Sequence, residues 1–211
     1  KDHSYVKYTV TYGEGEGAVK IEGAENQTEF ELPTGDKLKI SDAASVKDVA
    51  DTAANNNTYK YELENAEQYA EGTISTSYGT LTIEKRKITL TANDANNEYT
   101  GSTVTYATAA DAVVPYYAIS GDGLAEGQTI TAATLSGEGI KAGEYPITID
   151  KSSVAIGANT ANYEITVQPG TLTITANTTA ISIASDSKTW TYDGKDHSYV
   201  KYTVTYGEGE G

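Results

Sequence analysis

The chain has 211 residues, a formal net charge of −15, and neither cysteine nor methionine. Without cysteine it forms no disulfide and has no cysteine ligand for zinc. The acidic excess disfavours binding to nucleic acid or to anionic membranes, and we expect no insertion of this segment into a membrane. The absence of methionine leads us to expect an internal segment of a longer protein.

Alternating apolar residues predict β-strands along most of the chain. In the first strand Val6, Tyr8, Val10 and Tyr12 share one face, and the glycine- and glutamate-rich residues 13–17 follow as a turn. The 17 tyrosines suit half-exposed sheet surfaces. The expected fold class is therefore all-β, with further strands of the same pattern over residues 59–63, 145–149 and 163–167.

The stretch from Ser41 to Asn55 departs from this alternation. It is rich in alanine, and Val46, Val49 and Ala53 recur at helical spacing. We predict a short helical insert with Ser41 near its N-cap, and a plain loop is the alternative.

Two internal repeats organise the sequence. Residues 195–211 repeat residues 1–17 letter for letter, as KDHSYVKYTVTYGEGEG. A shorter repeat, Gly-Thr-Leu-Thr-Ile, occupies residues 79–83 and 170–174. The long repeat indicates a tandem array of which the chain is slightly more than one period. The short repeat indicates two divergent copies of one domain type in each period.

The register of apolar residues predicts the domain boundaries. Leu81 and Ile83 have one parity, whereas Ile88 and Leu90 have the other, and a strand cannot change its buried face without entering another core. We therefore predict a last strand over residues 79–83 and a first strand immediately after it. The predicted domains are 1–85, which lacks its own first strand, 86–176, which is complete, and 177–211, which holds the first strands of the next repeat. Short polar linkers favour domains stacked end to end.

Several turns and strand ends form a recognisable set: Tyr-Asp-Gly at 192–194, Gly-Asp-Gly-Leu at 121–124, Ala-Gly-Glu-Tyr at 142–145, Ala-Asn-Tyr-Glu-Ile at 161–165, and Gly-Thr-Leu-Thr-Ile at 170–174. In this set the chain resembles the MBG and YDG repeat domains of bacterial cell-surface adhesins. The likeness covers the whole of residues 87–176 and only the ends of the other domain. It implies tandem Ig-like β-sandwich domains in a surface-displayed, extracellular protein. It carries over no ligand-contacting residue.

No catalytic constellation is visible, so we expect a protein that is not an enzyme and holds no cofactor. His3 and His197 occupy the same repeat position, and no nucleophile motif accompanies them. Asp94, Asn96 and Glu98 are weak calcium candidates without the spacing of an EF-hand, and turns rich in Asn and Asp are usually only turns.

An isopeptide crosslink is a further possibility for a surface fibre. It would require a pair such as Lys87 and Asn162 to meet in a desolvated pocket, which the spacing of the sequence does not predict.

The expected function is that of a structural stalk or fibre shaft outside the cell. The alternative is an adhesive module whose repeats bind glycans or surface proteins with avidity. The expected partners are neighbouring repeats of the same protein, because the strand that domain 1–85 lacks corresponds to residues 178–194. We expect Ile181, Ile183, Trp190 and Tyr192 to serve this assembly. A covalent array is favoured over a head-to-tail polymer formed by strand exchange.

Overall fold

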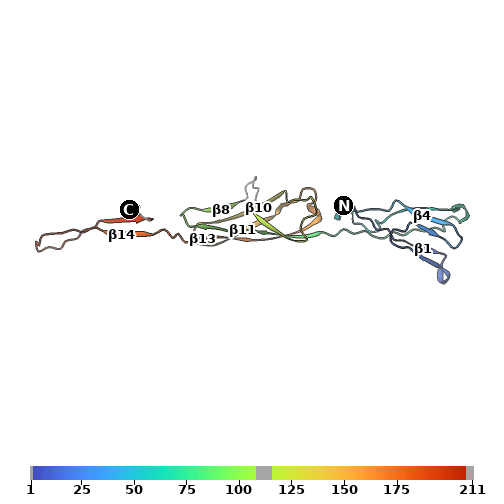
Figure 1. Cartoon of the computed structure of the whole chain (residues 1–211), viewed down its shortest axis with the longest axis horizontal. Coiled ribbons are helices and arrows are strands. Elements are labelled where there is room, and N and C mark those ends of the chain that lie inside the picture. The colour runs from blue at the N-terminus through green and yellow to red at the C-terminus, as the bar shows by residue number, and fades with distance from the viewer. Residues whose placement is uncertain (1, 108–115, 208–211) are drawn as a thin grey trace. The chain divides into compact units, whose positions relative to one another are not determined.

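The computed structural model describes residues 2–107 and 116–207, and within them nearly all regular structure is β-strand (Figure 1). This confirms the all-β prediction. Every helix in the described residues is a single 3-10 turn of three residues: η1 (Gly15–Gly17), η2 (Val49–Asp51), η3 (Ala66–Gln68) and η4 (Thr160–Asn162). The strands are β1 (Thr9–Tyr12), β2 (Val19–Glu22), β3 (Glu29–Glu31), β4 (Lys37–Ser41), β5 (Lys60–Leu63), β6 (Arg86–Ala92), β7 (Ala95–Glu98), β8 (Val104–Ala107), β9 (Tyr117–Gly121), β10 (Ala132–Gly139), β11 (Gly143–Ala155), β12 (Tyr163–Gln168), β13 (Gly170–Thr175), β14 (Ile181–Ser185) and β15 (Tyr202–Tyr206).

The chain forms two compact units, each composed of three segments. Unit 1 comprises Lys1–Thr89, Ile119–Ala132 and Val154–Thr166. Unit 2 comprises Leu90–Ala118, Ala133–Ser153 and Val167–Gly211. Because these segments interleave along the sequence, the domain boundaries expected after residues 85 and 176 remain predictions.

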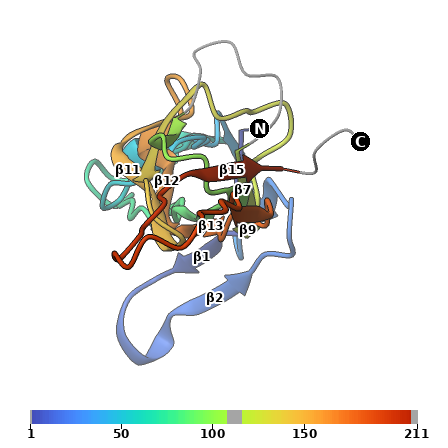
Figure 2. The same cartoon turned by 90° about the vertical axis from the view of Figure 1, so that its left-hand side faces the viewer.

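Unit 1 contains two small antiparallel sheets. β1 pairs with β2, with Val10 opposite Ile21, and the two strands lie side by side in Figure 2. The loop between them holds η1, which confirms the turn predicted over residues 13–17. β3, β4 and β5 form the other sheet, in which Leu38 of β4 lies opposite Phe30 on one side and Leu63 on the other.

The core of these sheets is apolar and follows the predicted alternation. Tyr8, Phe30 and Ile40 are buried together, and the side chains packed against them are Val6, Val10, Ile21, Leu38 and Tyr59. The ring of Tyr59 meets that of Tyr8 edge-on, with 5.1 Å between centroids. The predicted inward face of the first strand is thus the face that the core covers.

The helix predicted over residues 41–55 is wrong. Ser41 is the last residue of β4, and Val46 is buried and pairs through its backbone with His3. Only Val49–Asp51 is helical, as the single turn η2. The carboxylate of Asp51 accepts hydrogen bonds from the backbone N–H groups of residues 47 and 48, at 2.7 and 2.8 Å. The bond from residue 48 belongs to a capping box with Asp48 as the N-cap, so the helical turn begins after Asp48 and does not extend back to Ser41. The loop alternative is therefore the correct one.

Unit 2 contributes most of a five-stranded sheet in the order β7-β13-β11-β10-β8. In it β13 pairs in parallel with β7 and antiparallel with β11, so Leu172 has Ala95 on one side and Tyr145 on the other. Four of these strands, β8, β10, β11 and β13, are seen alongside one another in Figure 1. The buried apolar residues of unit 2 are Leu90, Ala92, Leu135, Ile147, Ile149, Leu172 and Ile174.

The strand expected over residues 79–83 is absent, although its second copy forms β13. Gly79 makes an isolated bridge with Asn57, and no ladder continues from it. Instead the side chain of Asn56 binds both backbone groups of Leu81, accepting from its N–H at 2.6 Å and donating to its carbonyl at 2.9 Å. The N–H of Ile83 donates to the hydroxyl of Thr52 at 2.9 Å. Side chains thus replace the neighbouring strand that the prediction assumed.

Candidate functional site

One face of the β14–β15 hairpin in unit 2 is an ordered row of exposed apolar side chains. The two strands are antiparallel, with Ile181 opposite Tyr206 and Ile183 opposite Val204. Residues directly opposite in such a pair point to the same face. We call this the apolar hairpin face, and its members are between 62% and 70% exposed: Ile181, Ile183, Tyr202, Val204 and Tyr206. Contiguous exposed apolar side chains of this kind commonly mark an interaction surface.

The connection between β14 and β15 carries the other two residues predicted to serve assembly. The ring of Trp190 stacks on that of His197, with 5.2 Å between centroids, and Tyr199 meets Trp190 edge-on. Asp193 holds His197 through its carboxylate at 2.8 Å. Tyr192 is 95% exposed and lies outside this ring cluster. The four predicted residues therefore divide into two on the hairpin face, one in the ring cluster and one in solvent.

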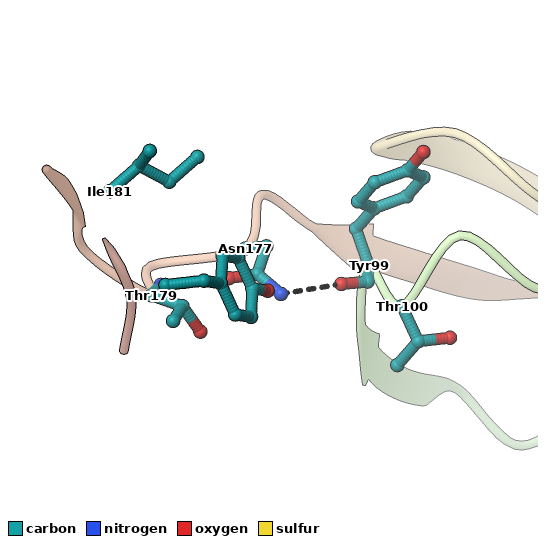
Figure 3. Close-up of a pocket in the computed structure, with 6 residues that line it drawn as sticks. Tyr99, Thr100, Asn177, Thr179 and Ile181 are labelled. Carbon is teal, nitrogen blue, oxygen red and sulfur yellow. Dashed lines mark hydrogen bonds between the residues drawn. The ribbon is translucent and has the colours of Figure 1, made fainter. Parts of the chain in front are cut away.

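An open hollow of about 370 Å³ lies at the base of the hairpin in unit 2. Its lining combines hydroxyl, amide, aromatic and aliphatic side chains: Tyr99, Thr100, Asn177, Thr179, Ile181 and Tyr206. Figure 3 shows the amide of Asn177 donating to the carbonyl oxygen of Tyr99, at 3.0 Å. The other amide atom accepts the N–H of Thr179 at 2.7 Å. The lining carries no charged side chain, so it suits a neutral polar ligand better than an ion.

The calcium candidates make structural hydrogen bonds around β7 and β13. The carboxylate of Asp94 accepts the N–H of Thr171 at 2.7 Å, and that of Glu98 accepts the N–H of Thr178 at 3.0 Å. Asn96 belongs to β7 and lies opposite Thr173. Within residues 2–107 and 116–207, no three His, Cys, Asp or Glu side chains are grouped so that they could hold a metal ion.

The amide of Asn162 is engaged within unit 1. Its nitrogen donates to the carboxylate of Asp48 at 2.6 Å, and its oxygen accepts the N–H of Val49 at 2.9 Å. These bonds occupy the group that an isopeptide crosslink with Lys87 would use. Sequence reasoning missed the contact, because the partners are separated by 114 residues and no local pattern links them.

A second missed cluster surrounds Asp36 after β3. Tyr69 and Asn65 each donate to its carboxylate at 2.7 Å, and Thr34 donates at 2.9 Å. These hydrogen bonds, that from Tyr69 foremost, hold the pKa of Asp36 below its ordinary value. The charged form of the carboxylate is thereby favoured, and Asp36 acts as an anchor for this turn.

His3 and its repeat copy His197 have different surroundings. The backbone of His3 exchanges hydrogen bonds of 2.7 and 2.8 Å with that of Val46, whereas the ring of His197 binds Asp193. Neither arrangement places a serine or threonine nucleophile on the imidazole among the contacts of the described residues.

Comparisons of the chain with protein-family profiles, with curated proteins and with solved structures found no match. In the part of the chain that the structure describes, no helix has the length and apolar character needed to cross a bilayer.

Proposed function

We propose that the chain is a repeat from the shaft of an extracellular, bacterial-type surface fibre, with a mechanical role in place of a catalytic one. The observation that carries the proposal is the 17-residue sequence present twice. Its described parts contain a strand at the same place in both copies, β1 near the start of the chain and β15 near its end. A sequence repeated letter for letter is typical of an array in which each copy meets the same kind of neighbour.

The distribution of polar groups supports a structural role. Within the described residues, every buried side chain of the core is apolar or tyrosine, and none is charged. The carboxylates and amides that sequence reasoning considered for chemistry bind backbone N–H groups at turns and strand ends. Groups used in this way hold a scaffold and leave little for a reaction. Tandem Ig-like sandwiches stacked end to end are the arrangement we propose for it.

Solution scattering tests the shaft. Small-angle X-ray scattering of chains that contain one, two and three repeats should show a maximum dimension that grows in proportion to the number of repeats. A dimension that grows only as the cube root of mass would mean that the domains collapse on one another, and would reject the shaft.

The hollow beside Tyr99 favours a second candidate, an adhesive module for glycans or surface proteins. An exposed tyrosine ring near hydroxyl and amide groups can stack on a sugar and bond to it. If this is the function, Tyr99→Ala abolishes binding to a glycan array, while Tyr61→Ala does not. Tyr61 is a matched control, because it is 38% exposed and Tyr99 is 39% exposed. Absence of binding by the unsubstituted chain would reject the candidate.

A further inference from the structure

The first copy of the repeated sequence pairs through one edge of its strand. In unit 1 the carbonyl of Tyr8 accepts the N–H of Gly23 at 2.9 Å, and that of Val6 accepts the N–H of Asn26 at 2.8 Å. β1 continues this pairing to Tyr12, with β2 as its partner. The even-numbered residues thus direct their backbone groups toward β2.

The second copy pairs through the other edge. The carbonyl of Lys201 accepts the N–H of Asp186 at 3.0 Å, and the N–H of Gly207 donates to Ala180 at 2.9 Å. Lys201 and Gly207 repeat Lys7 and Gly13, so the residues facing β14 correspond to odd positions of the first copy. Successive residues of a strand direct their N–H and C=O groups to opposite edges. One sequence therefore has two strand partners, β2 and β14, that do not compete for the same edge.

The free stretch of β1 matches the length that β14 covers. On the odd edge of the first copy, His3 pairs with Val46, and the carbonyl of Tyr5 accepts the Asn57 side chain at 3.3 Å. Beyond these, within the described residues, the backbone groups of Lys7, Thr9 and Thr11 have no hydrogen-bond partner. Their repeat copies are Lys201, whose carbonyl accepts the N–H of Asp186, and Thr203 and Thr205, which lie opposite Ala184 and Ser182 of β14.

The side-chain faces also agree. Ile181 and Ile183 lie opposite Tyr206 and Val204, which repeat Tyr12 and Val10. In unit 1 the side of the strand that carries Val10 and Tyr8 packs on the core of Phe30 and Ile40. A β14 strand placed on the free edge of β1 would thus turn both isoleucines toward that core.

We propose that β14 of one molecule pairs with the free edge of β1 in a second copy of this chain, with Ile181 opposite Tyr12 and Ile183 opposite Val10. The acceptor then contains a three-stranded sheet, β14-β1-β2, and the β15 strand of the donor is released. Backbone hydrogen bonds lost and gained are the same, because the sequences are identical. The difference is the burial of Ile181 and Ile183, which are 65% and 70% exposed in the hairpin.

The donor can release β14 readily, because an isolated two-stranded hairpin is only marginally stable in water. The strand donation goes beyond the proposed shaft function, since it joins separate chains, whereas the repeats within one chain are joined covalently.

Disulfide trapping between two differently substituted chains tests the pairing. The chain has no cysteine, so in a mixture of one molecule with Thr11→Cys and another with Ser182→Cys the mixed disulfide, separated from the two homodimers, reports on the proximity of these two positions. Both positions are exposed, and Ser182 lies opposite Thr205, the repeat copy of Thr11. A hydrogen-bonded antiparallel pair has its Cα atoms about 5.5 Å apart, which suits a disulfide. We expect the mixture, oxidised at high concentration, to shift from monomer to a mixed dimer that reductant reverses.

Two controls make the result specific to register and to strand donation. Ile183→Cys mixed with Thr11→Cys should yield little mixed dimer, because the neighbouring residue points to the other face. A single chain carrying Ser182→Cys and Thr205→Cys should close its own hairpin on oxidation. Oxidation should then abolish self-association in sedimentation velocity, and reduction should restore it.

Equal mixed-dimer yields from the Ser182→Cys and Ile183→Cys chains would overturn the register. No mixed dimer above the background of random collisions would overturn strand donation itself. That second result would leave the shaft function standing, since a covalent array needs no exchange. The shaft function fails separately, on a compact scattering profile.

Discussion

Residues 170–174 and 79–83 have the same sequence, Gly-Thr-Leu-Thr-Ile, but only residues 170–174 form a strand. In β13, Leu172 is fully buried and Ile174 is 2% exposed, with strands on both sides. In the other copy Leu81 and Ile83 are half-buried, and the side chains of residues 52 and 56 take the place of a neighbouring strand. The comparison shows that an alternating sequence determines which side chains share a face. Whether a strand forms depends on a neighbouring strand that can pair with it.

Substitution of the central leucine by alanine should give the largest difference in free energy of unfolding between the two copies. Leu172→Ala opens a cavity in a closely packed core, and we expect a loss of about 3 kcal/mol in the free energy of unfolding. Leu81→Ala should cost less than about 1.5 kcal/mol, because part of that side chain already contacts water. Urea unfolding followed by circular dichroism measures both. Equal losses would show that residues 79–83 are as well packed as residues 170–174.

Gly170 and Gly79, the first residues of the two copies, also differ in the space around them. A Cβ atom on Gly170 would lie 2.5 Å from the carbonyl oxygen of Ala92, whereas one on Gly79 would meet nothing within 4 Å. Gly170→Ala should therefore lower the free energy of unfolding by about 1–3 kcal/mol through overpacking. Gly79→Ala should leave it unchanged or raise it slightly. A destabilising effect at residue 79 alone would contradict the packing described.

The side-chain substitute for a strand can be removed directly. Asn56→Ala deletes both hydrogen bonds to Leu81 and should cost about 1 kcal/mol, with faster amide exchange at Leu81. Asn56→Asp is the matched variant, because it retains the acceptor for the Leu81 N–H and loses only the donor. Unchanged exchange at Leu81 in Asn56→Ala would show that other contacts hold the segment.

As the pH falls, residues 79–83, which are held by side chains, should lose hydrogen-bond protection before residues 170–174 do. Hydrogen bonds from the backbone N–H groups of Asp48 and Lys47 hold the pKa of Asp51 below its ordinary value of 3.8. The depressed pKa means that this carboxylate contributes stability above pH 3.8, and that the contribution is lost as pH falls through the lower folded value. The backbone carbonyl of Asp51 also anchors the Asn56 side chain at 3.0 Å.

The Ile83 N–H donates to Thr52, the residue that follows Asp51, at 2.9 Å. The smallest effect is expected at this amide, whose exchange protection should decline below pH 4, after correction for the intrinsic rate. The decline should be absent in Asp51→Asn. A decline of the same size in the substituted chain would assign it to another group.

Much of the strand content could be predicted because it depends on local alternation. The inward residues Tyr8, Ile147, Ile149, Tyr163 and Ile165 are buried as their pattern predicts. Alternation states which face a residue occupies, and burial of that face is a local consequence wherever a partner strand exists. The all-β class and the turn over residues 13–17 followed from the same signal.

The errors have a common cause in contacts remote in sequence. Residues 41–55 have helical spacing but form no long helix, because Val46 is buried and pairs with His3. The spacing does not predict that contact. The strand predicted over residues 79–83 does not form, and the side chain of Asn56 binds the backbone of Leu81 in place of a neighbouring strand. The bond from Asn162 to Asp48 has no sequence signal at all, since amides and carboxylates are common in turns. The repeat predicts that residues 178–194, with Ile181 and Ile183, correspond to the strand that domain 1–85 lacks, whereas their pairing with residues 202–206 in a hairpin was not predicted.

The contact between Asn162 and Asp48 can form only late in synthesis of the chain, because the two residues are far apart in the sequence. Asp48 is made 114 residues before Asn162, which corresponds to roughly ten seconds at ordinary rates of synthesis. Throughout that interval the N–H of Val49 and the carboxylate of Asp48 have water as their partner in place of Asn162. The last segment of unit 1 is Val154–Thr166, so unit 1 closes only after the first two segments of unit 2 have been made in full. Translation speed between these points therefore governs how long the earliest strands wait, exposed, for the last segment of their own unit.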